Sequence, residues 1–117
     1  MADDLRVLIV EDDALIGMML SDMFEALDFA QPALAVSMVE AIEMVEKERF
    51  AGALIDVHLG GEKGWPVAEE LANRNIPFAF TTGGGTDVPP QFSDRQVIMK
   101  PFRLNDIEKI VREFLVE

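Results

Sequence analysis

The chain has 117 residues; half are hydrophobic and 27% are charged, a balance typical of one globular domain. The absence of cysteine and the single histidine, His58, exclude a disulfide scaffold, a thiolate metal site and a two-histidine metal site. The net charge of −12, from 22 acidic against 10 basic residues, repels phosphate-rich partners, so we expect neither nucleic acid nor a membrane as partner. We expect one domain over residues 1–117, without an output domain, in the cytoplasm because the sequence shows no signal segment or long apolar run.

Two kinds of hydrophobic pattern alternate along the chain. Short, β-branched apolar runs predict buried strands, and the longer segments between them have helical periodicity. Strict alternation predicts a parallel sheet with helices on both faces, because parallel strands need crossover connections. The expected fold is α/β, a flavodoxin-like doubly wound sheet of five strands in the order 2-1-3-4-5. The five predicted strands are Leu5–Val10, Pro32–Val36, Ala51–Ile55, Pro77–Thr81 and Gln96–Met99.

Start signals mark the predicted helices. Asp13 is a candidate N-cap, Ser37 followed by Glu40 has the spacing of a capping box, and Pro66 suits a first helical turn. The last helix is expected over Leu104–Leu115. The predicted inward faces are Leu15, Ile16, Met19, Leu20, Met23, Phe24 and Leu27 in the first helix, and Leu104, Ile107, Ile110, Val111, Phe114 and Leu115 in the last.

The segment before the fifth strand should supply a fourth crossover helix, but its composition opposes one. Residues 83–94 contain three glycines and two prolines, so we expect a short or degraded helix of one or two turns near Val88–Phe92. Val88 and Phe92 are then predicted to be exposed apolar anchors for a partner. The glycines Gly83–Gly85 match no phosphate-binding loop and predict flexibility.

Polar residues follow four of the predicted strands. Because carboxyl ends of parallel strands meet at one edge, we expect Glu11, Asp12, Asp56, Thr82 and Lys100 to converge there. Carboxylates packed together need a proton or a cation, and an all-oxygen cluster suits Mg²⁺. A lysine and a hydroxyl beside such a site can stabilise a phosphoryl group, and a central carboxylate can be the nucleophile that forms an aspartyl phosphate.

Four motifs, each at a strand end and in register over the whole chain, carry a family resemblance. The motifs are Val10–Asp13, Asp56–Leu59 followed by Gly64, Phe80–Gly83 and Lys100–Phe102. Together they look like the receiver (response regulatory) domain of bacterial two-component response regulators. The pattern Phe80–Gly85 further resembles a stand-alone, single-domain subgroup with an altered fourth helix.

The resemblance implies a phosphoacceptor and a Mg²⁺ site. Asp56 would accept a phosphoryl group from a sensor histidine kinase or a histidine phosphotransfer protein, and an unknown downstream protein would read the result. Asp12 would bind Mg²⁺ directly, Glu11 largely through water, and Asp56 and the backbone carbonyl of His58 would complete the set. Such a protein takes up a phosphoryl group and can lose it by autodephosphorylation, and it is not a turnover enzyme.

The resemblance also implies residues that respond to the phosphoryl group. Thr82 would move toward the phosphoryl oxygens, Lys100 would pair with them, and the peptide bond before Pro101 would be cis. The His58 side chain and Gly84 would lie at the pocket rim, where Gly84 offers no side chain to shield the phosphoryl group from water.

Departures from the family pattern and other functions stay open. Gly60 replaces a common proline, and Val97 stands where many receivers have a switching aromatic residue, which puts that coupling in doubt. A receiver-fold adaptor that acts without phosphorylation is one alternative. Another is a small aspartyl-phosphate phosphohydrolase, although His58 stands where those enzymes usually have a second aspartate. A flavin-binding electron carrier is disfavoured by the acidic loop after the first strand.

Overall fold

The computed structural model describes residues 5–84 and 88–116. Its central parallel sheet has the order β2-β1-β3-β6-β7, which is the predicted 2-1-3-4-5 order once a small separate hairpin is set aside. The strands are β1 (Arg6–Val10), β2 (Ala33–Ala35), β3 (Phe50–Asp56), β6 (Phe78–Thr82) and β7 (Val97–Met99). The fold prediction is therefore confirmed, and each observed strand overlaps its predicted run.

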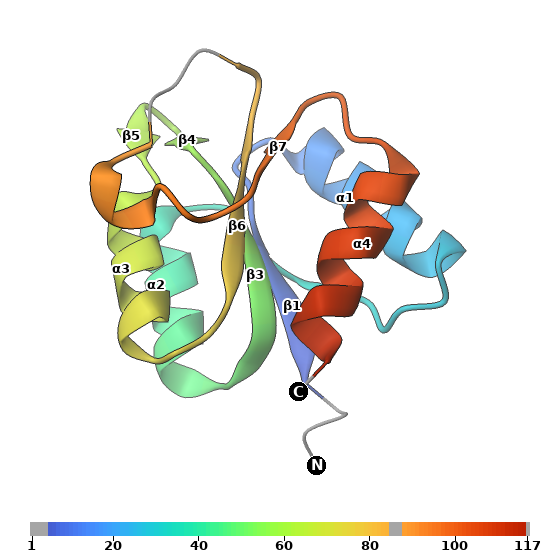
Figure 1. Cartoon of the computed structure of the whole chain (residues 1–117), viewed down its shortest axis with the longest axis horizontal. Coiled ribbons are helices and arrows are strands. Elements are labelled where there is room, and N and C mark those ends of the chain that lie inside the picture. Colours follow the sequence, from blue (N-terminus) through green and yellow to red (C-terminus); the bar gives the residue numbers. More distant parts are fainter. Residues whose placement is uncertain (1–4, 85–87, 117) are drawn as a thin grey trace.

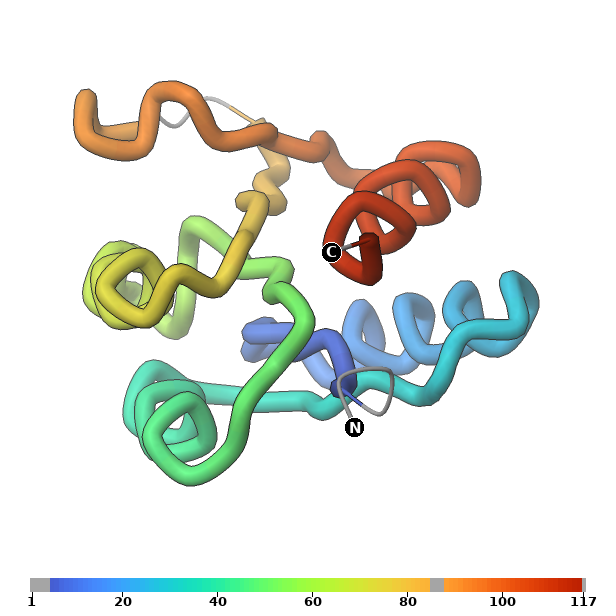
Figure 2. The backbone as a smooth tube through the Cα atoms, turned by 60° about the horizontal axis from the view of Figure 1, so that its bottom comes forward, coloured from blue at the N-terminus to red at the C-terminus, as the bar shows by residue number. Residues whose placement is uncertain are grey.

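Two helices cover each face of the sheet (Figures 1 and 2). One face carries α1 (Ala14–Ala26) and α4 (Leu104–Leu115), and the other carries α2 (Met38–Lys47) and α3 (Trp65–Asn73). All seven residues of β3 are buried, because this central strand is covered on both sides. None of the helices in residues 5–84 and 88–116 is long and apolar enough to cross a membrane.

The predicted start signals are confirmed by side-chain caps. Asp13 Oδ1 accepts a hydrogen bond from the Leu15 backbone N–H at 2.9 Å at the start of α1. Ser37 Oγ accepts from the Glu40 N–H at 3.1 Å, and Glu40 returns its carboxylate to the N–H of the residue before Ser37 at 2.8 Å. Pro66 lies in the first turn of α3. These bonds satisfy amide groups that the first helical turn leaves without a partner.

The predicted buried faces of the first and last helices include residues that are exposed in the structure. Leu15 and Met19 of α1 are exposed, and so are Leu104 and Leu115 at the two ends of α4. A helix on a flat sheet buries only the side chains that point straight at the strands, and its terminal residues extend past the sheet. The buried positions are Gly17, Leu20 and Phe24 in α1, and Ile107, Ile110, Val111 and Phe114 in α4.

The degraded fourth helix is confirmed as a single 3-10 turn, η2 (Pro90–Phe92), although Gly85 lies outside the described residues. The prediction of an exposed Phe92 is wrong: its side chain is buried, and its ring lies 5.7 Å from the Phe78 and Phe80 ring centroids. Val88 is half-buried against the same core. Trp65 adds an edge-on contact with Phe80. Aromatic burial thus anchors a segment that lacks helical hydrogen bonds.

Candidate functional site

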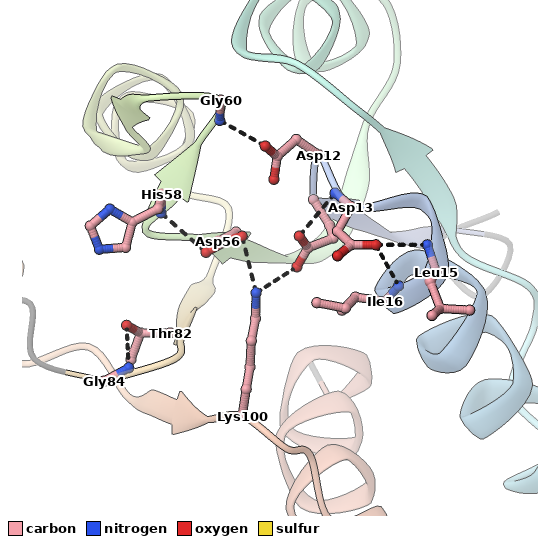
Figure 3. A network of polar contacts seen from close by, with 11 residues as sticks. Asp12, Asp13, Leu15, Ile16, Asp56, His58, Gly60, Thr82, Gly84 and Lys100 are labelled. Atoms are coloured by element: carbon pink, nitrogen blue, oxygen red, sulfur yellow. Dashed lines mark hydrogen bonds and ion pairs between the residues drawn. The ribbon is translucent and has the colours of Figure 1, made fainter.

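Side chains from three strands meet at the carboxyl edge of the sheet (Figure 3). Glu11 and Asp12 follow β1, Asp56 ends β3, and Lys100 follows β7. Carboxylate oxygens of Glu11, Asp12 and Asp56 all lie within 4.8 Å of one another. The structure therefore brings together four of the five predicted strand-end residues, and the sheet order explains why, because β1, β3 and β6 are neighbours and β7 is next along.

Lys100 bridges two buried carboxylates. Its Nζ lies 3.1 Å from Glu11 Oε1 and 3.1 Å from Asp56 Oδ2. Burial lowers the pKa of Lys100, but the contacts of its ammonium with the Glu11 and Asp56 carboxylates outweigh that effect and hold its pKa above the usual value. Its backbone is also fixed, because the Lys100 N–H donates to the Thr82 carbonyl at 2.8 Å and the bond to Pro101 is cis, as predicted.

The pKa of the Glu11 carboxyl group is set by its burial and by the charged groups around it. Its Oε2 accepts a hydrogen bond from the Asp13 N–H at 3.2 Å, while Oε1 is buried and has the Lys100 ammonium as its neighbour. Burial, reinforced by the hydrogen bond with Asp56, raises the pKa of Glu11 to about 7 despite the contact with Lys100. Glu11 therefore holds or releases a proton near neutral pH according to the charge placed beside it.

Asp12 is held by a small hairpin that the sequence analysis missed. Strands β4 (His58–Leu59) and β5 (Glu62–Lys63) pair antiparallel around Gly60 and Gly61. Both glycines have positive φ, 54° and 89°, which suits a two-residue hairpin turn. The Gly60 N–H donates to Asp12 Oδ2 at 2.8 Å. The signal was present, since a Gly-Gly pair between two extended dipeptides is a hairpin pattern.

Asp56 is fixed from both of its sides. The His58 N–H donates to Asp56 Oδ1 at 3.1 Å, opposite the Lys100 contact on Oδ2. Gly64 packs against the same residue from below: a Cβ at this position would lie 2.7 Å from the Asp56 carbonyl oxygen. A side chain at Gly64 would therefore force the backbone of Asp56 or of Gly64 to shift, and this explains the glycine that follows the motif.

The remaining predicted residues surround the site without joining the carboxylate cluster. Thr82 is buried at the end of β6, and its hydroxyl accepts a hydrogen bond from the Gly84 N–H at 3.1 Å. The His58 ring is exposed and lies on the side away from the carboxylates, with Nδ1 3.4 Å from Lys63 Nζ (Figure 3). Gly84, at φ 119°, is half-buried where a side chain would press on Met99.

The donor set fits a small hard cation. Three carboxylates contribute only oxygen, and their mutual spacing of up to 4.8 Å is close to the span of roughly 4 Å across an octahedral Mg²⁺ shell. Glu11 Oε1 is buried and forms no hydrogen bond of good geometry with the described residues. One ammonium faces three carboxylates, so a divalent ion would relieve the remaining repulsion.

The comparison with known protein families gives a match over residues 7–112 to the response regulator receiver domain. The chain belongs to this family. As a receiver domain it is 43% identical to SdrG from Sphingomonas melonis Fr1, with a TM-score of 0.81 over 99% of this chain and 100% of that one. The BeF3-activated conformation of SdrG from Pseudomonas melonis Fr1 is 45% identical, with a TM-score of 0.79 over 95% of this chain and 96% of that one.

More distant solved structures agree with the assignment. The receiver domain of the response regulator PhyR from Erythrobacter litoralis is 27% identical, with a TM-score of 0.75 over 95% of this receiver and 89% of that chain. No curated protein matches the sequence significantly. Recognition of the receiver family from the four strand-end motifs is therefore confirmed.

Proposed function

We propose that this receiver domain accepts a phosphoryl group on Asp56, in a Mg²⁺-dependent transfer from a phosphohistidine. The observation that carries the proposal is the environment of Asp56, a buried carboxylate that contacts one ammonium and has two further carboxylates within metal-binding distance. A capping or turn aspartate would need neither neighbour. The BeF3-activated conformation of the related SdrG adds support, because it shows that a similar fold responds to a small inorganic group.

The residues divide the work of the transfer. An Asp56 carboxylate oxygen attacks phosphorus, a P–O bond forms, and the P–N bond to the donor histidine breaks with its electron pair returning to the imidazole. The His58 N–H and the Lys100 ammonium hold the two Asp56 oxygens in place before the reaction. Afterwards the Lys100 ammonium lies beside the new phosphoryl oxygens and offsets their charge.

Mg²⁺ would be held by Asp12, Glu11 and Asp56, with the His58 carbonyl as a further ligand, and would neutralise charge that builds up on the phosphoryl oxygens. Asp12 would exchange its hydrogen bond to Gly60 for this role. Glu11 would lose its proton when Mg²⁺ adds its positive charge to that of the Lys100 ammonium. Thr82 would exchange its bond to the Gly84 N–H for a phosphoryl oxygen, which links the end of β6 to the state of Asp56.

The partners follow from the family. A histidine kinase or a histidine phosphotransfer protein would supply the phosphoryl group, and a protein contact would transmit the result. The exposed rim at His58 and the bare Gly84 leave the acyl phosphate open to water, so slow autodephosphorylation would end the signal. We propose that this receiver domain is a signalling acceptor of the cytoplasm that does not catalyse turnover.

The direct test is incubation with Mg²⁺ and acetyl phosphate, followed by intact mass. We expect one phosphoryl addition in the native chain and none in Asp56→Asn, which keeps size and shape but not the nucleophile. Lys100→Ala should slow labelling by at least about tenfold, since the ammonium beside the acceptor is lost.

The same experiment separates the alternatives. Continuous release of phosphate from the donor, without accumulation of labelled protein, would favour a phosphohydrolase. An unlabelled native chain would favour an adaptor that acts without phosphorylation. Equal labelling of Asp56→Asn would show that another side chain is the acceptor.

A further inference from the structure

A groove along the open edge of β7 lies beside the proposed phosphoacceptor site and shares Lys100 with it. β7 is the last strand of the sheet, and in Figure 2 this orange segment runs along the outer margin of the molecule. The groove has a volume of about 440 Å³ and lies between the β7 backbone and the first turns of α4. It is lined by Gln96–Pro101, Arg103, Asp106 and Lys109.

Backbone N–H and C=O groups of β7 on the side of this groove are available to hydrogen-bond with an added strand. The Gln96 carbonyl accepts from Phe80 N–H at 2.9 Å, and Lys100 N–H donates to the Thr82 carbonyl at 2.8 Å. In a strand the direction of these groups alternates, so Val97 and Met99 direct their N–H and C=O groups away from β6. In residues 5–84 and 88–116 no segment pairs with β7 on that side, which leaves an unprotected strand edge.

The two faces of this edge differ in character. Ile98 is buried beneath α4, so Val97 and Met99 point to the opposite face, where they are 43% and 56% exposed. The short η2 turn replaces the helix that would otherwise cover such a face. An added strand would therefore meet apolar side chains on one of its faces.

The other face is basic in a strongly acidic protein. Arg103 and Lys109 are exposed, and neither forms an ion pair with the described residues. Asp106 is the acidic residue of the groove lining. The whole chain has a net charge of −12, whereas this side of the groove has an excess of basic side chains. Such a surface favours an acidic ligand through charge complementarity.

We propose that the β7 edge binds an extended acidic segment of a partner protein, which adds as a sixth strand to the sheet. Its residues alternate, with apolar side chains over Val97 and Met99 and carboxylates toward Arg103 and Lys109. Main-chain hydrogen bonds supply affinity and the alternating side chains supply selectivity. A second copy of this chain fits less well, because two copies carry −12 each and would place their basic residues against one another.

The proposal does not depend on phosphorylation, so its test uses the native chain without a phosphodonor. The probe is a labelled, acetylated eight-residue peptide that alternates Glu and Val. We expect it to bind with a dissociation constant below about 1 mM and to shift the NMR amide signals of Val97 and Met99 and protect them from hydrogen exchange. No binding at about 1 mM, or shifts confined to another surface, would overturn the proposal.

Two modified peptides test the mode of binding. A peptide with the same composition but four consecutive Glu before four Val should bind at least about tenfold more weakly, because it cannot present one residue type to each face. Peptides N-methylated at every second residue, in either phase, should separate into one that binds and one that does not. Equal binding of all these peptides would mean non-specific attraction and would contradict strand addition.

A matched pair of protein variants tests the charges. Arg103→Glu with Lys109→Glu should weaken binding at least about tenfold, while Lys47→Glu with Arg49→Glu makes the same charge change at the end of α2 and should have little effect. Equal losses would assign the effect to overall charge and contradict the groove. Sedimentation velocity that shows a dimer of the chain alone, dissociated by Arg103→Glu with Lys109→Glu, would identify a second copy as the occupant and overturn the proposal.

Discussion

The carboxyl ends of β1 and β3 and the open edge at β7 lie close together, yet they are built in opposite ways. At the first, Glu11 and Asp56 are 4% exposed and each carboxylate contacts a neighbour from a different strand. At the second, Val97 and Met99 are exposed, and the crossover before them is a single 3-10 turn. The proposed phosphoacceptor site lies where the sheet is covered on both faces, and the proposed strand-binding edge lies where no described helix covers the face of Val97 and Met99.

Lys100 joins these two regions. It directly follows β7, and its ammonium contacts the Asp56 carboxylate at the end of β3. A change at Asp56 therefore acts on the strand that borders the open edge. The predictions below ask how far the two regions are independent.

The largest expected effect tests the anchor of the open edge. Phe92→Ala removes a buried ring from the cluster with Phe78, Phe80 and Trp65, and should lower the free energy of unfolding by about 3 kcal/mol. Urea unfolding measures the loss. Phosphorylation by acetyl phosphate should keep its native extent, because the aromatic partners of this ring are outside the carboxylate cluster. Val88→Ala, at a half-buried neighbour, should cost less.

A parallel loss of phosphorylation in Phe92→Ala, under conditions where the variant is folded, would break the comparison. It would mean that the aromatic cluster holds both the η2 turn and Asp56 in place.

The second prediction concerns pH at the covered region. The pKa of Glu11 is raised from 4.5 to about 7 in the folded protein, so between these pH values the folded state holds a proton that the unfolded state has lost. Without Mg²⁺, the free energy of unfolding should therefore fall as pH rises through this window, by up to about 3 kcal/mol. Glu11→Gln should flatten this dependence, and saturating Mg²⁺ should abolish it in the same window, because Glu11 is then ionised in both the folded and the unfolded state. A native profile that matches Glu11→Gln at every pH would contradict the buried proton.

A third prediction sharpens the steric limits around the acceptor. Gly64→Ala places a methyl group against the Asp56 carbonyl and the Ile55 side chain, at 2.7 and 2.8 Å. We expect about 1–2 kcal/mol lower stability and slower labelling of Asp56. Gly83→Ala is the matched control, since a Cβ there meets nothing within 4 Å. Equal stability and equal labelling of the two variants would show that the close approach of Gly64 to the Asp56 carbonyl limits neither property.

The contrast between the regions also explains what the sequence could predict. The positions of Glu11, Asp56 and Lys100 follow from strand ends, because a parallel sheet brings such ends to one edge whatever the loops do. The burial of Phe92 does not follow, since a three-residue turn has no periodicity to assign an inward face. The hairpin that holds Asp12 was missed although Gly60-Gly61 is a turn signal, because the flanking strands have two residues each, too few for an alternation to be recognised.

The smallest expected effects lie on β7 itself. Val97→Ser and Met99→Ser change exposed side chains, so each should alter the free energy of unfolding by less than about 0.5 kcal/mol and leave the phosphorylation rate unchanged. Chemical denaturation and intact mass measure both quantities. A marked loss of phosphorylation in either variant would show that the open edge takes part in the chemistry.

The most direct test of the central claim identifies the atom that carries the phosphoryl group. After incubation with Mg²⁺ and acetyl phosphate, borohydride reduces an acyl phosphate to an alcohol, and peptide mass spectrometry then locates the changed residue. The account predicts homoserine at position 56 alone. Reduction at Glu11, Asp12 or Asp13 in place of Asp56, or none in a protein that intact mass shows to be labelled, would contradict it.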